Sequence, residues 1–393
     1  MKREVLNILQ IASYNGNIGD MANHNGFRSS MENHMPYDCV FSNLEMRNFY
    51  KSWGIQKFDD DFVKIVNEYD LLVIGGGGFF DIKWDYSSTG TTVDLSEEIL
   101  EKINTPILFN CLGVSLPSEI NEVATKKFGS FLRYANDSEK CFVTVRNDGS
   151  IEKIQELYGD NVSGRIRKVP DGGFFCKGND IYHSEIVEDC INVAISIGGD
   201  MPHVRFMGDD KKISEEDFVD KFSDYCVELL LYRDNIRLIF VPHIFDDYDL
   251  MSKIFKKIPD RLLRTRVTCT SCLNGLNTNG MTSFDIYQKC DLVVGMRYHA
   301  NVVPIGMFVP TLAIFTYDKH LKLYADIGIP HRCIEANLTG FEKELLKKTI
   351  DILENPENAV SENIKIMKKL KAENNLYMDS LLSWYSSLGK NGR

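Results

Sequence analysis

Short apolar runs recur along the chain, and each ends in glycine, proline or a polar turn. The runs are continuous rather than alternating, which is typical of parallel strands covered on both faces. We predict strands at Val5–Ala12, Leu71–Ile74, Ile107–Leu112, Phe142–Val145, Ile191–Ile197, Ile236–Val241, Leu292–Val294 and Thr311–Phe315. Helical patterns lie between many of them, at Ile151–Tyr158, Glu215–Tyr232, Asp247–Ile258 and Phe284–Lys289. Strands that alternate with helices predict an α/β fold built on open parallel sheets.

The length and the breaks of the chain predict two domains. Its 393 residues exceed what one hydrophobic core usually serves. A turn-rich break at Lys177–Asp180 precedes the strand that opens at Ile191, so we place a boundary near residue 180. We expect domains at residues 1–180 and 181–335. Residues 336–393 read as helices rich in lysine and glutamate with no strand, and such helices must pack on an existing layer.

Composition and charge narrow the class of protein. The 44% of hydrophobic and 26% of charged residues are ordinary for a globular chain. A net charge of −11 disfavours nucleic-acid partners, although one cleft can still be basic. No run of eighteen apolar residues predicts a transmembrane helix, and the apolar start lacks a cleavage site, so we expect a cytoplasmic protein. Ten dilute cysteines predict reduced thiols, and without an H-E-x-x-H pattern we expect no metal.

Ligands bind at the carboxyl ends of parallel strands, so the residues that follow each strand are the candidates. Asn15–Asp20 follows the first strand, and its two glycines allow close backbone approach to a ligand. Asp20 either contacts a hydroxyl or caps the next helix. The glycines Gly75–Gly78 follow Leu71–Ile74 and predict a loop whose N–H groups form an anion nest or seat a sugar. No Lys-Ser/Thr pair follows, so this is not a Walker loop.

The strongest local signal follows the strand at Leu292–Val294. Arg297 and His299 come directly after it, and a helix begins near Ala300. Arginine offers a planar fork for carboxylate or phosphate, and a helix N-terminus adds backbone donors. Histidine is suited to proton transfer near neutral pH. The position of both groups favours function over the alternative, a surface salt bridge beside a capping histidine.

Three further polar residues follow other strands. Lys319 could supply a second cation for the same anion, although a single loop lysine is usually solvated. His243 either faces the site or caps the helix that starts at Asp246–Asp247. Arg146 is open to the same two interpretations.

Taken together, these pieces resemble the polysaccharide pyruvyl transferase family. The matching segments occur in family order, at Asn17-Ile-Gly-Asp20, Val73-Ile-Gly-Gly-Gly-Gly78, Val145-Arg-Asn-Asp-Gly-Ser150, Val169-Pro-Asp171, Val241-Pro-His243, Met296-Arg-Tyr-His-Ala300 and Thr316-Tyr-Asp-Lys319. They span roughly residues 5–325, and the block around Arg297 is the most specific. The resemblance implies two Rossmann-like domains facing a cleft, as in the glycosyltransferase-B fold. It also implies that helices at the C-terminus return to the first domain.

The resemblance further implies phosphoenolpyruvate as co-substrate, with no cofactor, and a cyclic pyruvate ketal on a surface polysaccharide as product. The donor would lie on the second domain and the saccharide acceptor on the first. The family's donor-binding residues correspond to Arg297, His299 and Lys319, with His243 and Arg146 as further candidates. His299 and Asp20 are the candidates for proton transfer. Candidate acceptor contacts are Asn17, Gly19, Gly76, Gly77, Gly78 and Asp81. The sequence departs from the family at Gly198-Gly199-Asp200, where an arginine often stands and Arg205 comes later, and at Asn147 in place of an aspartate.

Two alternatives stay open at this stage. One is a glycosyltransferase of the same fold that uses a nucleotide sugar, in which Arg297 and His299 would grip a diphosphate. The other is a carbohydrate-binding or scaffold protein that has lost its activity. The basic stretches Lys347–Lys348 and Lys365–Lys371 could approach anionic lipid and a lipid-linked acceptor, giving peripheral membrane contact. A solvated helix face is the simpler interpretation of such charges.

Overall fold

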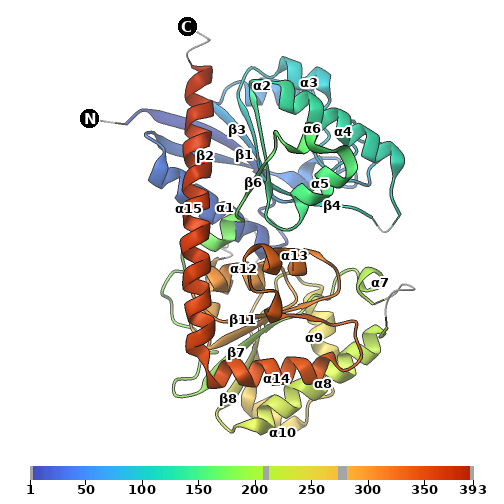
Figure 1. The fold of residues 1–393 in the computed structure, drawn as a ribbon, viewed down its shortest axis with the longest axis vertical. Helices are drawn as coiled ribbons and strands as arrows, with labels where there is room; N and C mark the ends of the chain where they lie inside the picture. The colour runs from blue at the N-terminus through green and yellow to red at the C-terminus, as the bar shows by residue number, and fades with distance from the viewer. Residues whose placement is uncertain (1–2, 118, 207–211, 273–280, 390–393) are drawn as a thin grey trace. The chain divides into compact units, whose positions relative to one another are not determined.

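The computed structural model describes residues 3–117, 119–206, 212–272 and 281–389. The chain forms two compact units. Unit 1 comprises Met1–Tyr14, Asn23–Gly172 and Leu370–Arg393, and unit 2 comprises Asn15–Ala22 and Gly173–Lys369. Each unit is built on a six-stranded sheet with helices packed against it (Figure 1).

The sheet of unit 1 has the strand order β2-β1-β3-β4-β5-β6, and all its neighbours pair in parallel. Its strands are β1 (Val5–Ala12), β2 (Asp38–Glu45), β3 (Leu71–Asp81), β4 (Ile107–Ser115), β5 (Cys141–Arg146) and β6 (Arg167–Val169). The helices in this part of the chain are α1 (Ile18–His34), η1 (Met46–Phe49), α2 (Asp60–Val66), α3 (Glu97–Lys102), α4 (Glu122–Asp137), α5 (Ser150–Tyr158), α6 (Asp160–Ser163) and η2 (Gly172–Phe175).

Both faces of this sheet are buried, as the continuous apolar strands predict. Along β1, Leu9 and Ile11 belong to one hydrophobic core, while Leu6 and Ile8 belong to another. The first core is filled mainly by α2, α3 and α4, and the second by α1 and the C-terminal helix. From Ile8 to Ala12 every residue of β1 is buried, so no solvent-facing residue interrupts this part of the strand, which is why the sequence identified it.

The sheet of unit 2 has the order β12-β11-β10-β7-β8-β9, again with parallel pairs. Its strands are β7 (Ile191–Ser196), β8 (Ile236–Phe240), β9 (Val267–Cys269), β10 (Leu292–Gly295), β11 (Thr311–Phe315) and β12 (Cys333–Glu335). Its helices are α7 (Pro202–Arg205), α8 (Glu215–Tyr232), α9 (Asp247–Phe255), α10 (Asp260–Arg266), α11 (Met281–Gln288), α12 (His299–Gly306), α13 (Lys319–Asp326), η3 (Pro330–Arg332) and α14 (Phe341–Glu354).

The chain ends in α15 (Pro356–Leu388), a helix of 33 residues that contributes to both units. In unit 2, the Asn363 side chain donates to the Val309 carbonyl oxygen at 2.8 Å. In unit 1, the Tyr377 hydroxyl donates to Asn110 Oδ1 at 2.6 Å. The preceding α14 packs against α8 of unit 2. Residues 336–393, which the sequence assigned as one group to the first domain, are thus divided between the two units.

Two local expectations were wrong. The glycines Gly75–Gly78 do not form a loop, because β3 continues through them to Asp81. Four strands were also missed: β2, which lies at the sheet edge with mostly half-exposed residues, and the three-residue strands β6, β9 and β12. Short or half-exposed strands carry too few apolar residues to stand out from loops. Among the described residues, no helix is long and apolar enough to cross a membrane.

Candidate functional site

The candidate site lies in unit 2, where β7, β8, β10 and β11 end in loops. The sheet order places β7 and β10 side by side, with β8 and β11 flanking them. The loops after these strands carry Asp200, His243, Arg297 and Tyr317. Because neighbouring parallel strands end at the same edge, residues nearly 120 positions apart in sequence meet there.

Asp247 holds three of these loops together. Its side chain is fully buried at the start of α9. The carboxylate accepts backbone N–H bonds from Gly199 at 3.0 Å and from His243 at 2.9 Å. It also accepts from Arg297, whose Nε lies 3.1 Å from Oδ1 and whose second terminal nitrogen bonds the same oxygen. Asp247 therefore fixes both the backbone and the guanidinium of the site, a role that the sequence did not assign to it.

Arg297 bridges two carboxylates. Besides Asp247, it contacts Asp200 Oδ1 at 2.9 Å, and its side chain is only 12% exposed. Burial alone would lower the pKa of Arg297, but these carboxylates raise it above its ordinary value. Burial would likewise raise the pKa of Asp200, but Arg297 and Arg205 lower it to about 2. Arg297 and Asp200 are thus both charged across the physiological range.

Arg205 is a site residue that the sequence set aside. It ends α7 and is almost completely buried. Its NH2 lies 2.8 Å from Asp200 Oδ1, and a Cβ atom on Gly198 would lie 2.6 Å from the same nitrogen. The absence of a side chain at Gly198 therefore makes room for Arg205. An arginine side chain does lie beside the end of β7. It belongs to Arg205, which the chain brings back to Gly198 and Asp200.

Lys319 and two tyrosines border the same cluster. Nζ of Lys319 lies 5.5 Å from the ring centroid of Tyr298 and 5.2 Å from that of Tyr317. Cζ of Arg205 also lies 5.2 Å from the Tyr317 ring. Burial would raise the pKa of Tyr317, but Lys319, Arg205 and Arg297 outweigh it and lower the pKa to about 8.

His299 is the first residue of α12 and is 5% exposed. Its ring lies against the start of α1: a Cβ atom on Gly19 would overlap Nδ1 of His299. Asn17 precedes α1, and its Oδ1 accepts the N–H of Gly19 at 2.9 Å. Asn17, rather than Asp20, therefore caps this helix, and Asp20 lies within its first turn. Asn17, Gly19 and Asp20 all belong to unit 2.

His243 is almost completely buried behind Arg297 and His299. Its Nε2 is 2.8 Å from the hydroxyl of Tyr287. Burial, followed by repulsion from Arg297 and His299, holds the pKa of His243 well below its ordinary value. A neutral, buried imidazole with a tyrosine partner positions its neighbours and is poorly placed to meet a donor itself.

Arg146 belongs to unit 1, whereas the residues described above belong to unit 2. It ends β5, contacts the carboxylate of Asp148, and lies 4.0 Å from Asp171. A Cβ atom on Gly113 would lie 2.5 Å from its guanidinium, so the glycine of β4 admits this side chain. The arginine is 7% exposed.

The predicted acceptor residues on β3 differ in their surroundings. A Cβ atom on Gly76 would meet Asn23 and His24 at 2.6 Å, and one on Gly77 would meet the Phe79 ring at 2.8 Å. These two glycines permit close packing in a buried strand. Gly78 is exposed, with nothing within 4 Å of such a Cβ position.

Asp81 orients an aromatic residue that the sequence analysis overlooked. Its Oδ2 accepts the indole N–H of Trp84 at 2.9 Å, and Oδ1 accepts the N–H of Thr92 at 2.9 Å. The ring of Trp84 lies 5.5 Å from that of Tyr86, which is 44% exposed. Trp84 is half-buried and Tyr86 is exposed, so the two rings form a partly exposed aromatic pair, and a pyranose face can stack on such a surface.

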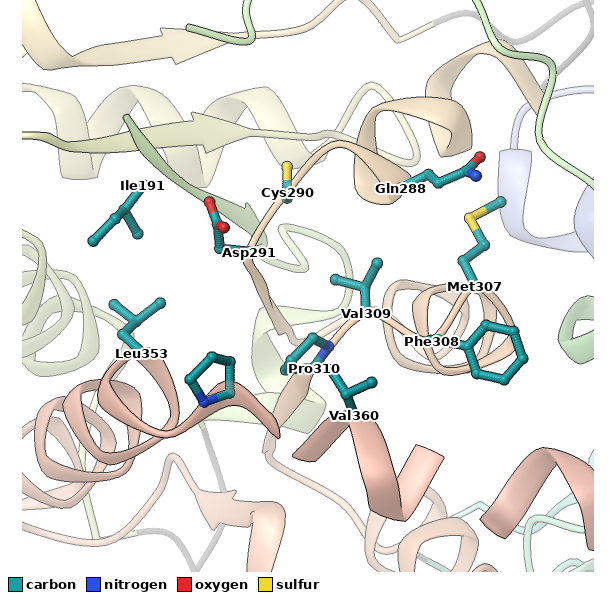
Figure 2. Close-up of a pocket in the computed structure, with 11 residues that line it drawn as sticks. Ile191, Gln288, Cys290, Asp291, Met307, Phe308, Val309, Pro310, Leu353 and Val360 are labelled. Carbon is teal, nitrogen blue, oxygen red and sulfur yellow. The ribbon is translucent and has the colours of Figure 1, made fainter. Parts of the chain in front are cut away.

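Groups of metal ligands and cavities are the other features that could mark a functional site. Within the described ranges, no group of three or more His, Cys, Asp or Glu side chains could hold a metal ion. A cavity of about 350 Å³ lies in unit 2, lined by residues such as Ile191, which begins β7, and Asp291 and Pro310, which precede β10 and β11 (Figure 2). It opens at the amino-terminal edge of the sheet, whereas Arg297 and Lys319 follow the strands at the other edge. The cavity is therefore separate from the candidate site.

The family model described as polysaccharide pyruvyl transferase matches residues 17–319. A search of the curated proteins found no match.

Solved structures match along nearly the whole chain. A protein of Listeria monocytogenes described as a UDP-N-acetylglucosamine 2-epimerase shares 12% identity with a TM-score of 0.57, covering 99% of this chain and 98% of its own. The S. aureus MnaA–UDP structure has 9% identity and a TM-score of 0.56, covering 99% and 98%. Anabaena HepE, in complex with UDP and glucose, has 11% identity and a TM-score of 0.52, covering 97% and 99%. At such identities the likeness shows the fold alone, and it confirms the predicted glycosyltransferase-B-like architecture of two α/β domains.

Proposed function

Because the chain belongs to the polysaccharide pyruvyl transferase family, we propose that it transfers the enolpyruvyl group of phosphoenolpyruvate to two hydroxyls of a saccharide. The product would be a cyclic pyruvate ketal on a surface polysaccharide. The observation that carries this proposal is the group of three cations, Arg205, Arg297 and Lys319, gathered with His299 at one edge of the unit 2 sheet.

The charges of this group suit a small anion with two acidic ends. Arg297 and Arg205 share the carboxylate of Asp200, while Asp247 neutralises part of Arg297 from behind. Three cations against these two carboxylates leave one positive charge, and Arg297 and Lys319 are both partly exposed whereas Arg205 is buried. Phosphoenolpyruvate brings a carboxylate and a phosphate, and several cations in a partly dry site bind such groups well. Arg297 would fix the donor and Lys319 would approach its phosphate.

The reaction needs proton transfers and no electron transfer. A proton added to C3 of the donor makes C2 electrophilic, and an acceptor hydroxyl then attacks C2. The second hydroxyl displaces phosphate and closes the ketal. One acceptor proton ends on the new methyl group and the other on phosphate, so the reaction balances without a cofactor. His299 is the proposed acid that protonates C3, because it lies at the same strand end as Arg297.

The acceptor contacts belong to the same proposal. Asp20 and Asn17 lie in the segment that packs on the His299 side of unit 2, where they could orient a hydroxyl. In unit 1, Gly78 and Asp81 keep their proposed acceptor role, and Trp84 joins them as a stacking surface. Gly76 and Gly77 would act only through the shape of β3.

A lipid-linked acceptor and cytoplasmic peripheral membrane contact complete the proposal. The exposed Lys365, Lys368 and Lys371 lie on α15, and a basic helix surface is attracted to anionic lipid. Flotation with anionic vesicles at low salt tests this part: protein that stays at the bottom of the gradient contradicts it. Neutral vesicles are the control.

One experiment tests the function as a whole. The protein is incubated with phosphoenolpyruvate and candidate saccharides, and phosphate release is compared with the mass of the product. Release with a saccharide that gains a ketal-linked pyruvyl group supports the proposal. Thermal unfolding with phosphoenolpyruvate or with UDP-sugars separates it from the nucleotide-sugar alternative. Stabilisation by UDP-sugars alone, without phosphate release from phosphoenolpyruvate, would favour a glycosyltransferase.

A further inference from the structure

Tyr317 occupies an unusual place in the unit 2 site. It is the second residue after β11 and stands two residues before Lys319, so it lies close to the end of the strand. Two cations, Arg205 and Lys319, each lie 5.2 Å from its ring centroid. The adjacent Thr316 is 3.4 Å from Arg205 NH1, which ties the same loop to α7.

The groups that face this tyrosine come from four elements. Their charges are mixed, but cations predominate. They are Lys319 and His320 at the start of α13, Arg205 from α7, Asp200 after β7, and Arg297 after β10. The ionised form of a tyrosine in these surroundings is stabilised, because Lys319, Arg205 and Arg297 attract the negative charge of a phenolate.

We propose that Tyr317 is a catalytic residue of this site, and that its phenolate is the base that accepts the proton of the attacking acceptor hydroxyl. This inference rests on the proposed pyruvyl transfer and adds the base that the reaction needs. The acceptor O–H bond breaks, and its proton passes to the Tyr317 oxygen. The electron pair of the acceptor oxygen then forms the bond to C2 of the donor. In the same step C3 takes its proton from His299. Tyr317 later gives its proton to the leaving phosphate, and the second acceptor hydroxyl gives its proton to His299 as it closes the ketal, so the acid and the base are both restored over one cycle.

Two features support a base rather than a packing role. The side chain is not sealed in the core, since Tyr317 is half-buried while its neighbours Phe315 and Thr316 are buried. The pKa of about 8 that the cations impose lets about a tenth of the tyrosine ionise at pH 7, whereas an ordinary tyrosine ionises near 10. A bound trianionic donor takes up part of this positive charge, so the low pKa of Tyr317 belongs to the free enzyme, which is the state that kcat/KM reports.

The first test needs no substrate. The near-ultraviolet absorption of tyrosinate is titrated in the wild-type protein, in Tyr317→Phe and in the control Tyr232→Phe. Tyr232 is a surface residue whose pKa is raised by its bond to Glu354. We expect one tyrosine to titrate near pH 8 in the wild type and in Tyr232→Phe, and none there in Tyr317→Phe. Lys319→Met should move this titration upward. A tyrosine titration near pH 8 that persists in Tyr317→Phe overturns the proposal.

The second test uses turnover. In the wild type kcat/KM should rise with pH through about 8, because the base must be ionised. Tyr317→Phe should lose roughly 10²–10⁴-fold in kcat, with little change in donor affinity, and should lose the rise with pH. An unchanged kcat or an unchanged pH profile in this variant overturns the proposal. If the wild type releases no phosphate from phosphoenolpyruvate with any saccharide, the proposed function fails instead, and the titration still decides whether Tyr317 forms a phenolate.

Discussion

The backbone of Gly19 passes so close to the ring of His299 that any side chain at residue 19 would overlap Nδ1. Gly19 lies in the first turn of α1, and His299 opens α12, so two helix starts meet at the imidazole. Asn17 reinforces the contact because it caps α1 through the N–H of Gly19. The glycine therefore determines where His299 can lie.

Gly19→Ala should displace His299 and lower kcat, while the fold and donor binding persist. A double-mutant cycle with His299→Ala measures whether the effect passes through the histidine. We expect the double variant to be no slower than His299→Ala alone. If the two losses simply multiply, Gly19 acts by another route, such as a direct contact with the acceptor.

His299→Ala should lower turnover much more than donor affinity. A general acid contributes roughly 10²–10⁴-fold in rate, whereas a ligand of the donor changes binding and turnover together. Steady-state kinetics combined with calorimetric titration of phosphoenolpyruvate separates the two effects. His34→Ala is a suitable control, because His34 lies on α1 in unit 1 and bonds Asn375 rather than the site. A fall in turnover that only matches the fall in donor occupancy would make His299 a ligand.

Arg297→Ala should abolish donor binding, and Arg297→Lys should restore little of it. Lysine is a point charge and cannot span both Asp247 and Asp200 as the guanidinium fork does. Removing the arginine also leaves the buried carboxylate of Asp247 without a cation, and breaking such a pair costs about 3–5 kcal/mol. Calorimetry with phosphoenolpyruvate measures the binding, and denaturant unfolding measures the stability. Undiminished donor affinity in folded Arg297→Ala would remove this residue from the donor site.

The sequence predicted the strands and the residues that follow them better than it predicted their partners. Arg297 and His299 were identifiable because they come directly after a buried strand of the sheet. Arg205 was not, because it comes nine residues after β7 and reaches the site only by folding back beside Gly198. The sequence shows which residues come directly after a strand. It does not show which later residue a turn brings back to the end of that strand.

Asp247 and the β3 glycines illustrate the same limit. Asp247 looks like any acidic residue in the first turn of a helix, and its importance arises from three loops that meet around it. The glycines Gly75–Gly78 look like a loop because glycine disfavours strands, yet β3 runs through them, and close packing against Asn110 and His24 requires the small size of Gly75 and Gly76. In both cases, tertiary contacts that the sequence does not show determine the role or the conformation of these residues.

The enzyme should need no metal ion. The proposed chemistry uses only His299, Tyr317 and the three cations, and it transfers protons but no electrons. Activity should therefore persist after exhaustive dialysis against EDTA, measured as phosphate release at the pH of maximal turnover. Activity that disappears with EDTA and returns with Mg²⁺ would contradict this mechanism and favour a nucleotide-sugar enzyme.

The last prediction concerns how α15 holds unit 1. Leu381 is completely buried in the core that also contains Met31 and Leu71, whereas Leu376 on the same helix is 63% exposed. Leu381→Ala should lower the free energy of unfolding by about 2–5 kcal/mol, because it leaves a cavity. Leu376→Ala should stay within about 0.5 kcal/mol of the wild type, because an exposed leucine makes few contacts. Both changes remove the same atoms from one helix, so the pair isolates burial from helix propensity. Equal denaturation midpoints for the two variants would mean that this end of α15 does not stabilise unit 1.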